Sequence, residues 1–170
     1  MYVRSVKDWF GIGLFRELFT GSVSNVKIEK GYLYINDSNT YAGGVIGNIV
    51  GNVKVENCSV DMAVCSEVTN GTDCVGGIVG WCQSGAVITE CAFHGDISYR
   101  DSRGIFGGIC GYASRSTIIS CEEYLSTDST CIPAIIFIYQ YIACSQTIFD
   151  KTTIHFPCNL THTGTAHHNP

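Results

Sequence analysis

The histidines are the first residues to test for metal chemistry, because two of them one helical turn apart beside a glutamate would form a zinc hydrolase site. None of the five lies in an H-E-x-x-H sequence, and four of them fall within residues 155–170. They are His94, His155, His162, His167 and His168. The ten cysteines contain no C-x-x-C pair, which a zinc ribbon would require. We therefore expect neither a metal nor another cofactor.

Carboxylates offer a second kind of chemistry, since cleavage of a polysaccharide needs two carboxyl groups about 5 to 9 Å apart. The glutamates do not recur at one position. Glu56 lies two residues before its nearest cysteine, Glu90 one before and Glu122 one after. No G-x-S-x-G sequence marks a serine nucleophile either. We expect a protein that is not an enzyme, with a β-helix enzyme acting on polysaccharide as the alternative.

Composition narrows the class of protein. Of the 170 residues only 15% are charged, 19 are glycine, and the net charge is -5 without a basic cluster, which argues against nucleic-acid binding. The many Val, Ile, Thr and Tyr residues favour strands within one domain. The most apolar stretch, IPAIIFIYQYIAC at residues 132–144, is too short for a membrane span and is interrupted by a glutamine.

Cysteines and glycines reveal an internal repeat. The segments GGVIG, GGIVG and GGICG contain Gly44, Gly77 and Gly108 as their second glycine, at spacings of 77−44=33 and 108−77=31. The segments VENC, ITEC and IISC end at three cysteines whose spacings are 33 and 30. Both landmarks advance together, so they define repeated units. The repeat positions are Gly43, Gly44, Gly47, Gly76, Gly77, Gly80, Gly107, Gly108, Gly111, Cys58, Cys91 and Cys121.

A weaker first unit precedes these three. GLFR, beginning at Gly13, takes the place of GVIG with 44−13=31, and Val26 takes the place of Cys58 with 58−26=32. Valine at a cysteine position indicates a small apolar core residue, so we favour free, buried cysteines over a disulfide framework. WFGIGLFRELF in this unit is the single candidate for an amphipathic helix, which its glycines weaken.

The period and pattern predict an all-β fold, a β-solenoid of about four units of 31–33 residues. The units begin near residues 9, 41, 75 and 106 within a repeat domain at 1–123. Apolar residues at a period of two, as from Cys58 to Val60 and from Cys91 to Phe93, indicate strands, and the gap of three before each cysteine predicts a corner or bulge. We expect the glycines to form corners, through positive φ or close backbone approach, with pairs such as Val45–Ile46 as short strands between them.

These segments resemble GLUG motif repeats, through both the G-G-apolar-apolar-G element and the apolar-x-N-C element. The first unit departs from the motif because Arg16 replaces its closing glycine. The resemblance implies a secreted or cell-surface bacterial protein in which the repeats act as a spacer, an adhesion module or a scaffold that displays a ligand site. Some relatives carry such repeats beside a surface protease, so an accessory region of a larger protease is a further alternative.

Two aromatic residues, Trp81 and Tyr112, directly follow closing glycines and are candidates for stacking on sugar rings. The alternative is that they cover a corner of the fold. The expected partners are therefore a host or microbial glycan or a protein surface, together with neighbouring repeats of a longer chain. Residues 124–170 lack the repeat, and we expect either a capping segment or an aberrant end. The N-terminus has no secretory h-region, which fits a fragment of an exported protein.

Overall fold

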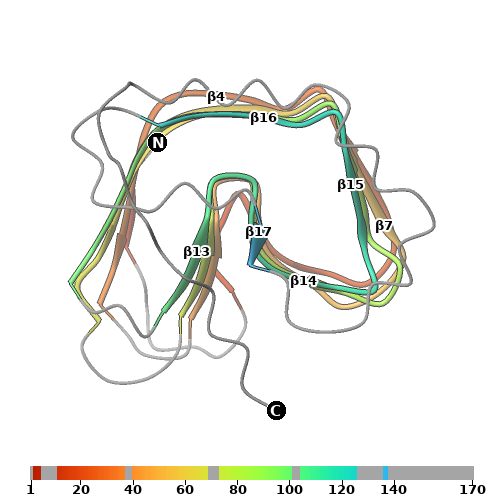
Figure 1. Ribbon diagram of the computed structural model, residues 1–170, viewed down its shortest axis with the longest axis horizontal. Helices are drawn as coiled ribbons and strands as arrows, with labels where there is room; N and C mark the ends of the chain where they lie inside the picture. The colour runs from red at the N-terminus through yellow and green to blue at the C-terminus, as the bar shows by residue number, and fades with distance from the viewer. Residues whose placement is uncertain are drawn as a thin grey trace, which may run out of the picture.

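The computed structural model describes residues 2–4, 11–36, 40–68, 73–100, 104–125 and 136–137, and every helix or strand assigned among them is a β-strand. The strands pair in parallel to form four sheets, which surround the core as the walls of a coil (Figure 1). The long sheet contains β1 (Tyr2–Arg4), β4 (Lys27–Ile35), β8 (Ser59–Ser66), β12 (Ala92–Tyr99) and β16 (Glu122–Leu125). The floor sheet contains β2 (Phe15–Leu18), β6 (Ile46–Ile49), β10 (Val79–Gln83), β14 (Cys110–Ser114) and β17 (Ile136–Phe137). The side sheet contains β3 (Gly21–Ser24), β7 (Val53–Glu56), β11 (Val87–Thr89) and β15 (Thr117–Ile119), and the short sheet contains β5 (Tyr41–Gly43), β9 (Cys74–Gly76) and β13 (Ile105–Gly107).

The register of the sheets confirms the β-solenoid and its period. In the short sheet Gly43 pairs with Gly76, which pairs in turn with Gly107. In the long sheet Ser59 pairs with Lys27 on one side and with Ala92 on the other, so each residue directly after the cysteine position is stacked on its equivalent. Equivalent residues in successive coils therefore form columns along the solenoid axis. No helix in the described ranges is long and apolar enough to cross a membrane.

A corner between the side and long sheets lies where the gap of three residues predicted it. The residue before each cysteine position adopts a positive φ between 49° and 59°, the left-handed conformation that asparagine tolerates best among non-glycine residues. These corner residues are Asn25, Asn57, Glu90 and Ser120. The Asn57 side-chain amide also donates a hydrogen bond of 2.7 Å to the Asn25 side chain. The chain turns at this corner, which aims the next residue into the core.

The repeated glycines have a different role from a positive-φ corner. None of the nine glycines in the three pentapeptides has a positive φ. They line a tight reversal between the short and floor sheets, visible as the arch between β13 and β14 in Figure 1. A Cβ on Gly80 would lie 2.7 Å from the Gly47 carbonyl oxygen and would also collide with the Ala42 backbone of the preceding coil. Close backbone approach is therefore the reason for glycine at this position.

The apolar pair inside each pentapeptide is also arranged differently from the expected short strand. Gly44 and Val45 form a bend, and the floor strand begins only at Ile46. The second glycine of each pentapeptide faces the long sheet, where a Cβ on Gly44 would lie 2.8 Å from Val60 Cγ1. The bend thus inserts glycine backbone against the side chains of the opposite wall. Val45 consequently belongs to a reversal of the chain, whereas Ile46 already belongs to the floor strand.

The first coil differs from the later ones in ways that its end position explains. The bridge between Ile12 and Ala42 places Gly13 beside Gly43, one residue away from the alignment with Gly44 that the sequence suggested. Arg16 occupies the column of the closing glycines, between the pairs that Phe15 and Glu17 form with β6. In later coils this glycine packs against the short sheet of the preceding coil, and the described residues include no short-sheet strand of a coil before Arg16. The candidate amphipathic helix is instead strand β2 over residues 15–18.

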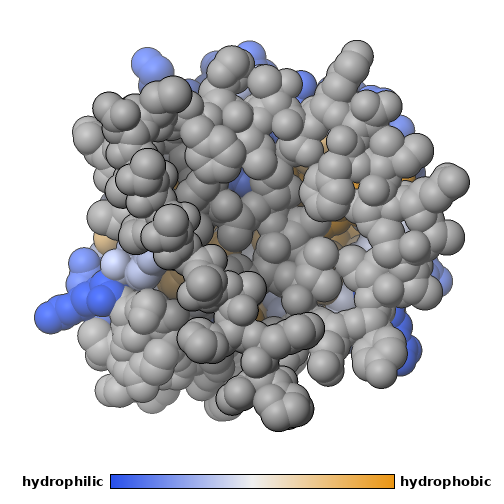
Figure 2. All heavy atoms as spheres, viewed as in Figure 1, coloured by the Kyte–Doolittle hydropathy of each residue, from blue (hydrophilic) through white to orange (hydrophobic). Residues whose placement is uncertain are grey.

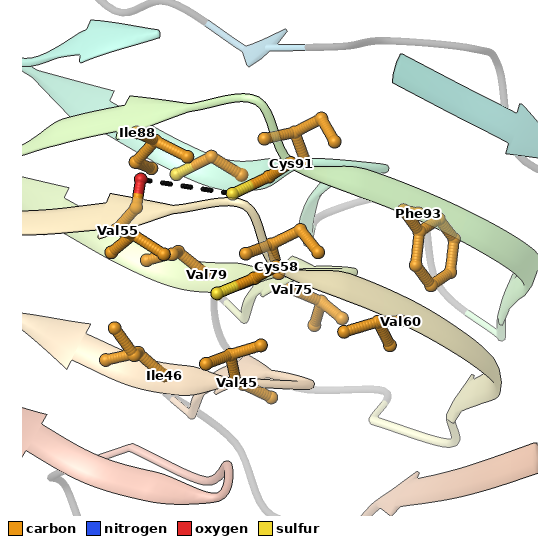
Figure 3. Close-up of a cluster of buried hydrophobic side chains, with 14 of the residues drawn as sticks. Val45, Ile46, Val55, Cys58, Val60, Val75, Val79, Ile88, Cys91 and Phe93 are labelled. Carbon is orange, nitrogen blue, oxygen red and sulfur yellow. Dashed lines mark hydrogen bonds between the residues drawn. The ribbon is translucent and has the colours of Figure 1, made fainter. Parts of the chain in front are cut away.

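Apolar columns fill the interior of the coil. Val60 and Phe93 from the long sheet and Ile46 and Val79 from the floor sheet lie inside the coil, and all four side chains are fully buried (Figure 3). Each unit could not bury this face alone, so stacking supplies the core. In the space-filling view the described atoms at the periphery are mainly hydrophilic, and the hydrophobic ones lie further in (Figure 2).

Candidate functional site: an aromatic column and a thiol column

The two aromatic residues expected to stack on sugars lie next to each other in the floor sheet. Trp81 on β10 pairs in register with Tyr112 on β14, and their ring centroids are 3.8 Å apart at 15°. Tyr41 from β5 of the preceding coil stacks on Trp81 at 4.8 Å and 29°. All three side chains are half-buried. The column is therefore a three-ring stack built by three successive coils.

This stacking determines which parts of the rings a ligand could reach. Because Tyr41 and Tyr112 come from the coils on either side of Trp81, the indole is enclosed between them. Sugar binding through aromatic residues normally uses an open ring face, whereas the Trp81 ring stacks on two tyrosine rings. The stack stabilises the contact between coils, and glycan stacking on Trp81 and Tyr112 remains a prediction.

The same column continues toward the first coil with polar residues. Asn48 on β6 pairs with Trp81, and Glu17 on β2 pairs with Asn48. The Asn48 amide donates a 2.7 Å hydrogen bond to a Glu17 carboxylate oxygen. Asn48 is only 7% exposed, and its carbonyl oxygen has no hydrogen-bond partner among the described residues. The column thus changes from stacked rings to a hydrogen-bonded pair at its N-terminal end.

The recurrent cysteines form a second column, at the entrance to the long sheet. Each thiol donates to two carbonyl groups, one in its own coil and one in the preceding coil. For Cys91 these are the Thr89 carbonyl at 3.2 Å and the Val55 carbonyl at 3.9 Å, the latter drawn in Figure 3. Cys58 and Cys121 repeat the same pair of contacts. The thiols consequently stabilise the corner by local hydrogen bonds as well as by packing.

The environment of Cys58 and Cys91 opposes nucleophilic chemistry, whereas a hydrogen bond with Cys91 lowers the pKa of the third thiol, Cys121, which is nevertheless only 6% exposed. A hydrogen bond with Cys91, followed by burial, raises the pKa of Cys58 well above its usual range. A hydrogen bond with Cys121 raises the pKa of Cys91 to about 12. Reactive cysteines need a depressed pKa and access to solvent, and Cys58 and Cys91 are each 1% exposed. We conclude that the column is structural.

All seven cysteines in the described residues are free thiols. Cys82 and Cys110 come closest, with sulfur atoms 3.5 Å apart in the core. In register, however, Cys82 lies opposite Ala113, three residues beyond Cys110. At this separation the two sulfur atoms are in hydrogen-bond contact, and both residues are free thiols.

The register also places the carboxylates considered for polysaccharide cleavage. Glu56 pairs with Thr89, and Glu122 pairs with Ala92, so neither lies opposite a second carboxylate in these pairs. Asp61 pairs with His94, whose ring stacks on Tyr124 at 4.6 Å on the outer face of the long sheet. Within the described ranges no group of three or more His, Cys, Asp and Glu residues could hold a metal ion. The other four histidines lie outside those ranges.

One buried carboxylate, Glu123, was not among the candidates from the sequence. Glu123 on β16 occupies the core column of Val60 and Phe93, packed against Gly108. Both of its carboxyl oxygens are buried without a hydrogen-bond partner among the described residues. Burial raises the pKa of Glu123 to about 7, an effect that the Gly108 backbone only partly offsets. The aligned residues Val60 and Phe93 could have exposed this mismatch, because a charged residue follows them in an apolar column.

The C-terminal segment contributes one described element. Ile136 and Phe137 form β17, which pairs with β14 at the outer edge of the floor sheet. The rest of the segment after residue 125, including its other apolar residues, lies outside the described residues.

Comparisons with protein-family models, with curated proteins and with solved structures return no match to this chain.

Proposed function

We propose that the chain is a non-catalytic repeat module of a secreted or cell-surface bacterial protein, and that it acts chiefly as a spacer. The observation that carries this proposal is the continuous stacking of coils in register, which buries one apolar core along the whole repeat region. A spacer needs a defined length and direction, and a solenoid supplies both through its columns. The resemblance to GLUG repeats supports the surface location.

A display role is the second reading, and the outward columns limit it. Multivalent binding to a repeated ligand is strongest when successive coils present the same group. On the long sheet one outward column reads Asp61, His94 and Tyr124, so each coil presents different chemistry. The aromatic column, with Trp81 and Tyr112, is the best-matched surface for a glycan or for a protein partner.

Binding and turnover assays on the purified chain separate the candidate roles. We expect no turnover of soluble bacterial polysaccharides, measured as new reducing ends, and no strong binding on a glycan array. Array binding that is lost in Tyr112→Ala, but retained in the outward control Tyr124→Ala, would establish glycan display. Release of reducing ends would overturn the non-catalytic proposal and favour the polysaccharide enzyme.

A further inference from the structure

The first coil presents an open strand edge with apolar side chains around it. β2 is the outermost strand of the floor sheet, and its outer edge pairs with no other strand that the structure describes. Leu14, Phe15 and Phe19 are 48%, 38% and 62% exposed. In contrast, Ile46 and Val79, which occupy the same column as Phe15, are fully buried. An unpaired apolar edge of this kind is a template for another strand.

The sequence along this edge is complementary to itself in the antiparallel direction. Residues 14–19 read Leu-Phe-Arg-Glu-Leu-Phe, with two apolar residues on each side of one positive and one negative charge. A two-fold axis between residues 16 and 17 would place Arg16 of one copy opposite Glu17 of the other. It would also place Phe15 opposite Leu18, and Leu14 opposite Phe19. Opposite charges and apolar pairs across antiparallel strands are stabilising.

The side-chain directions permit this pairing. Residues directly opposite each other in an antiparallel pair must point to the same face of the sheet. Phe15 and Leu18 meet this condition although they are three residues apart, because both occupy columns that belong to the core. The ladder between β2 and β6 omits Arg16 and Gly47, so two residues lie between the core-facing positions. Glu17 is directed toward Asn48 in the aromatic column, outside the core set.

We propose that β2 pairs antiparallel with β2 of a second copy of this chain to form a two-fold symmetric dimer. The contact is isologous, so each interaction occurs twice about the axis. A head-to-tail contact would instead bring β2 to the outer edge of β14, where β17 already pairs. The self-complementary charges and the obstruction at the opposite end together favour joining the two N-terminal coils.

Sedimentation velocity over a range of concentrations tests the proposal with the full chain. Arg16→Glu and Glu17→Arg each place four like charges at the two-fold axis, and we expect each variant to dimerise about tenfold more weakly than the wild type. An equimolar mixture of the two variants restores opposite charges at every position, so the mixture should recover a heterodimer. Lys27→Glu makes the same charge change elsewhere on the first coil and should leave dimerisation unchanged.

Hydrogen exchange locates the contact and keeps the test decisive if a variant is unstable. Amides of residues 15–18 in the wild type should exchange more slowly as concentration rises. A chain that stays monomeric up to ~1 mM would overturn the proposal. It would equally be overturned by a dimer that protects other segments, or by variants that fail to rescue each other although circular dichroism shows them folded.

Discussion

The buried carboxyl of Glu123 should make the stability of the last described coil depend on pH. Its pKa is raised from an ordinary value of 4.5 to about 7 in the folded chain. Between these values the folded state binds more protons than the unfolded state, so the free energy of unfolding falls as pH rises. The stabilisation is complete below pH 4.5 and is lost as pH rises through about 7. A shift of this size corresponds to a change of at most about 3 kcal/mol.

The magnitude is an upper bound, because the ionised side chain can rotate partly toward water. Glu123 is only half-buried as a residue, although its two oxygens are inaccessible. Rotation would remove contacts with Gly108 and leave a gap in the column that Phe93 fills one coil earlier. The lost contacts and the gap both loosen the packing between β16 and the arch that joins β13 to β14. Local opening should therefore accompany the loss of stability.

Urea unfolding measured by circular dichroism from pH 4.5 to 8 provides the assay, with Glu123→Gln as the test variant. The glutamine keeps the shape but cannot ionise, so the difference between wild type and variant isolates this one group. We expect the wild type to lose stability relative to Glu123→Gln as pH rises. Glu122→Gln, which removes an exposed neighbouring charge, is the matched control. Parallel pH profiles for wild type and Glu123→Gln would refute the argument.

Three further predictions concern the columns. Gly80→Ala should destabilise the fold by ~3 kcal/mol or more in thermal melts, because the added Cβ would collide with the Ala42 backbone. Arg16→Ala, in the same column of the first coil, should cost below ~1 kcal/mol. Equal losses of stability in the two variants would contradict the explanation that Arg16 is tolerated because it lies at the end of the column. Cys91→Val should cost less than ~1.5 kcal/mol of stability, because Val26 already occupies the same column in the first coil. In peptide-resolved thiol labelling of the native chain, Cys65 should be modified before the buried Cys91. Rapid labelling of Cys91 would oppose a structural role. Trp81→Ala should cost ~2–4 kcal/mol in urea unfolding, since it removes both ring contacts, and a change below ~0.5 kcal/mol would show that the stack contributes little.

The agreement between sequence and structure is closest where a residue recurs. Cys58, Cys91 and Cys121 were aligned by spacing alone, and the strand register places them in one column. The corner before them was predicted because strand periodicity breaks at a fixed distance from each cysteine. A left-handed residue at that point explains the break, since it changes the direction of the chain without a glycine. Because the pattern recurs in successive units, each unit provided an independent indication of the same local geometry.

The glycines show where this reasoning was incomplete. Positive φ and close approach both call for glycine, and one sequence does not distinguish them. Only the positions of neighbouring coils show that Gly80 meets the backbone around Ala42. Those positions also explain Arg16, because the glycine column loses its constraint at the coil before which no short-sheet strand is described. The candidate helix in that coil became a strand for the same reason, since pairing with β6 outweighs a weak local preference.

The sequence by itself determined the period, the strand class and the residues that enter the core, because each of these repeats at nearly constant spacing. The tertiary structure decided how the short and floor sheets lie against each other, which depends on the chain reversal at the glycines and on the loops between units. It thereby brought Tyr41 onto Trp81 and enclosed the indole, for which the sequence allowed either sugar stacking or the covering of a corner. It also placed Glu123 in an apolar column, where burial raises the pKa of the carboxyl. The residues next to Glu123 in the sequence do not reveal this burial.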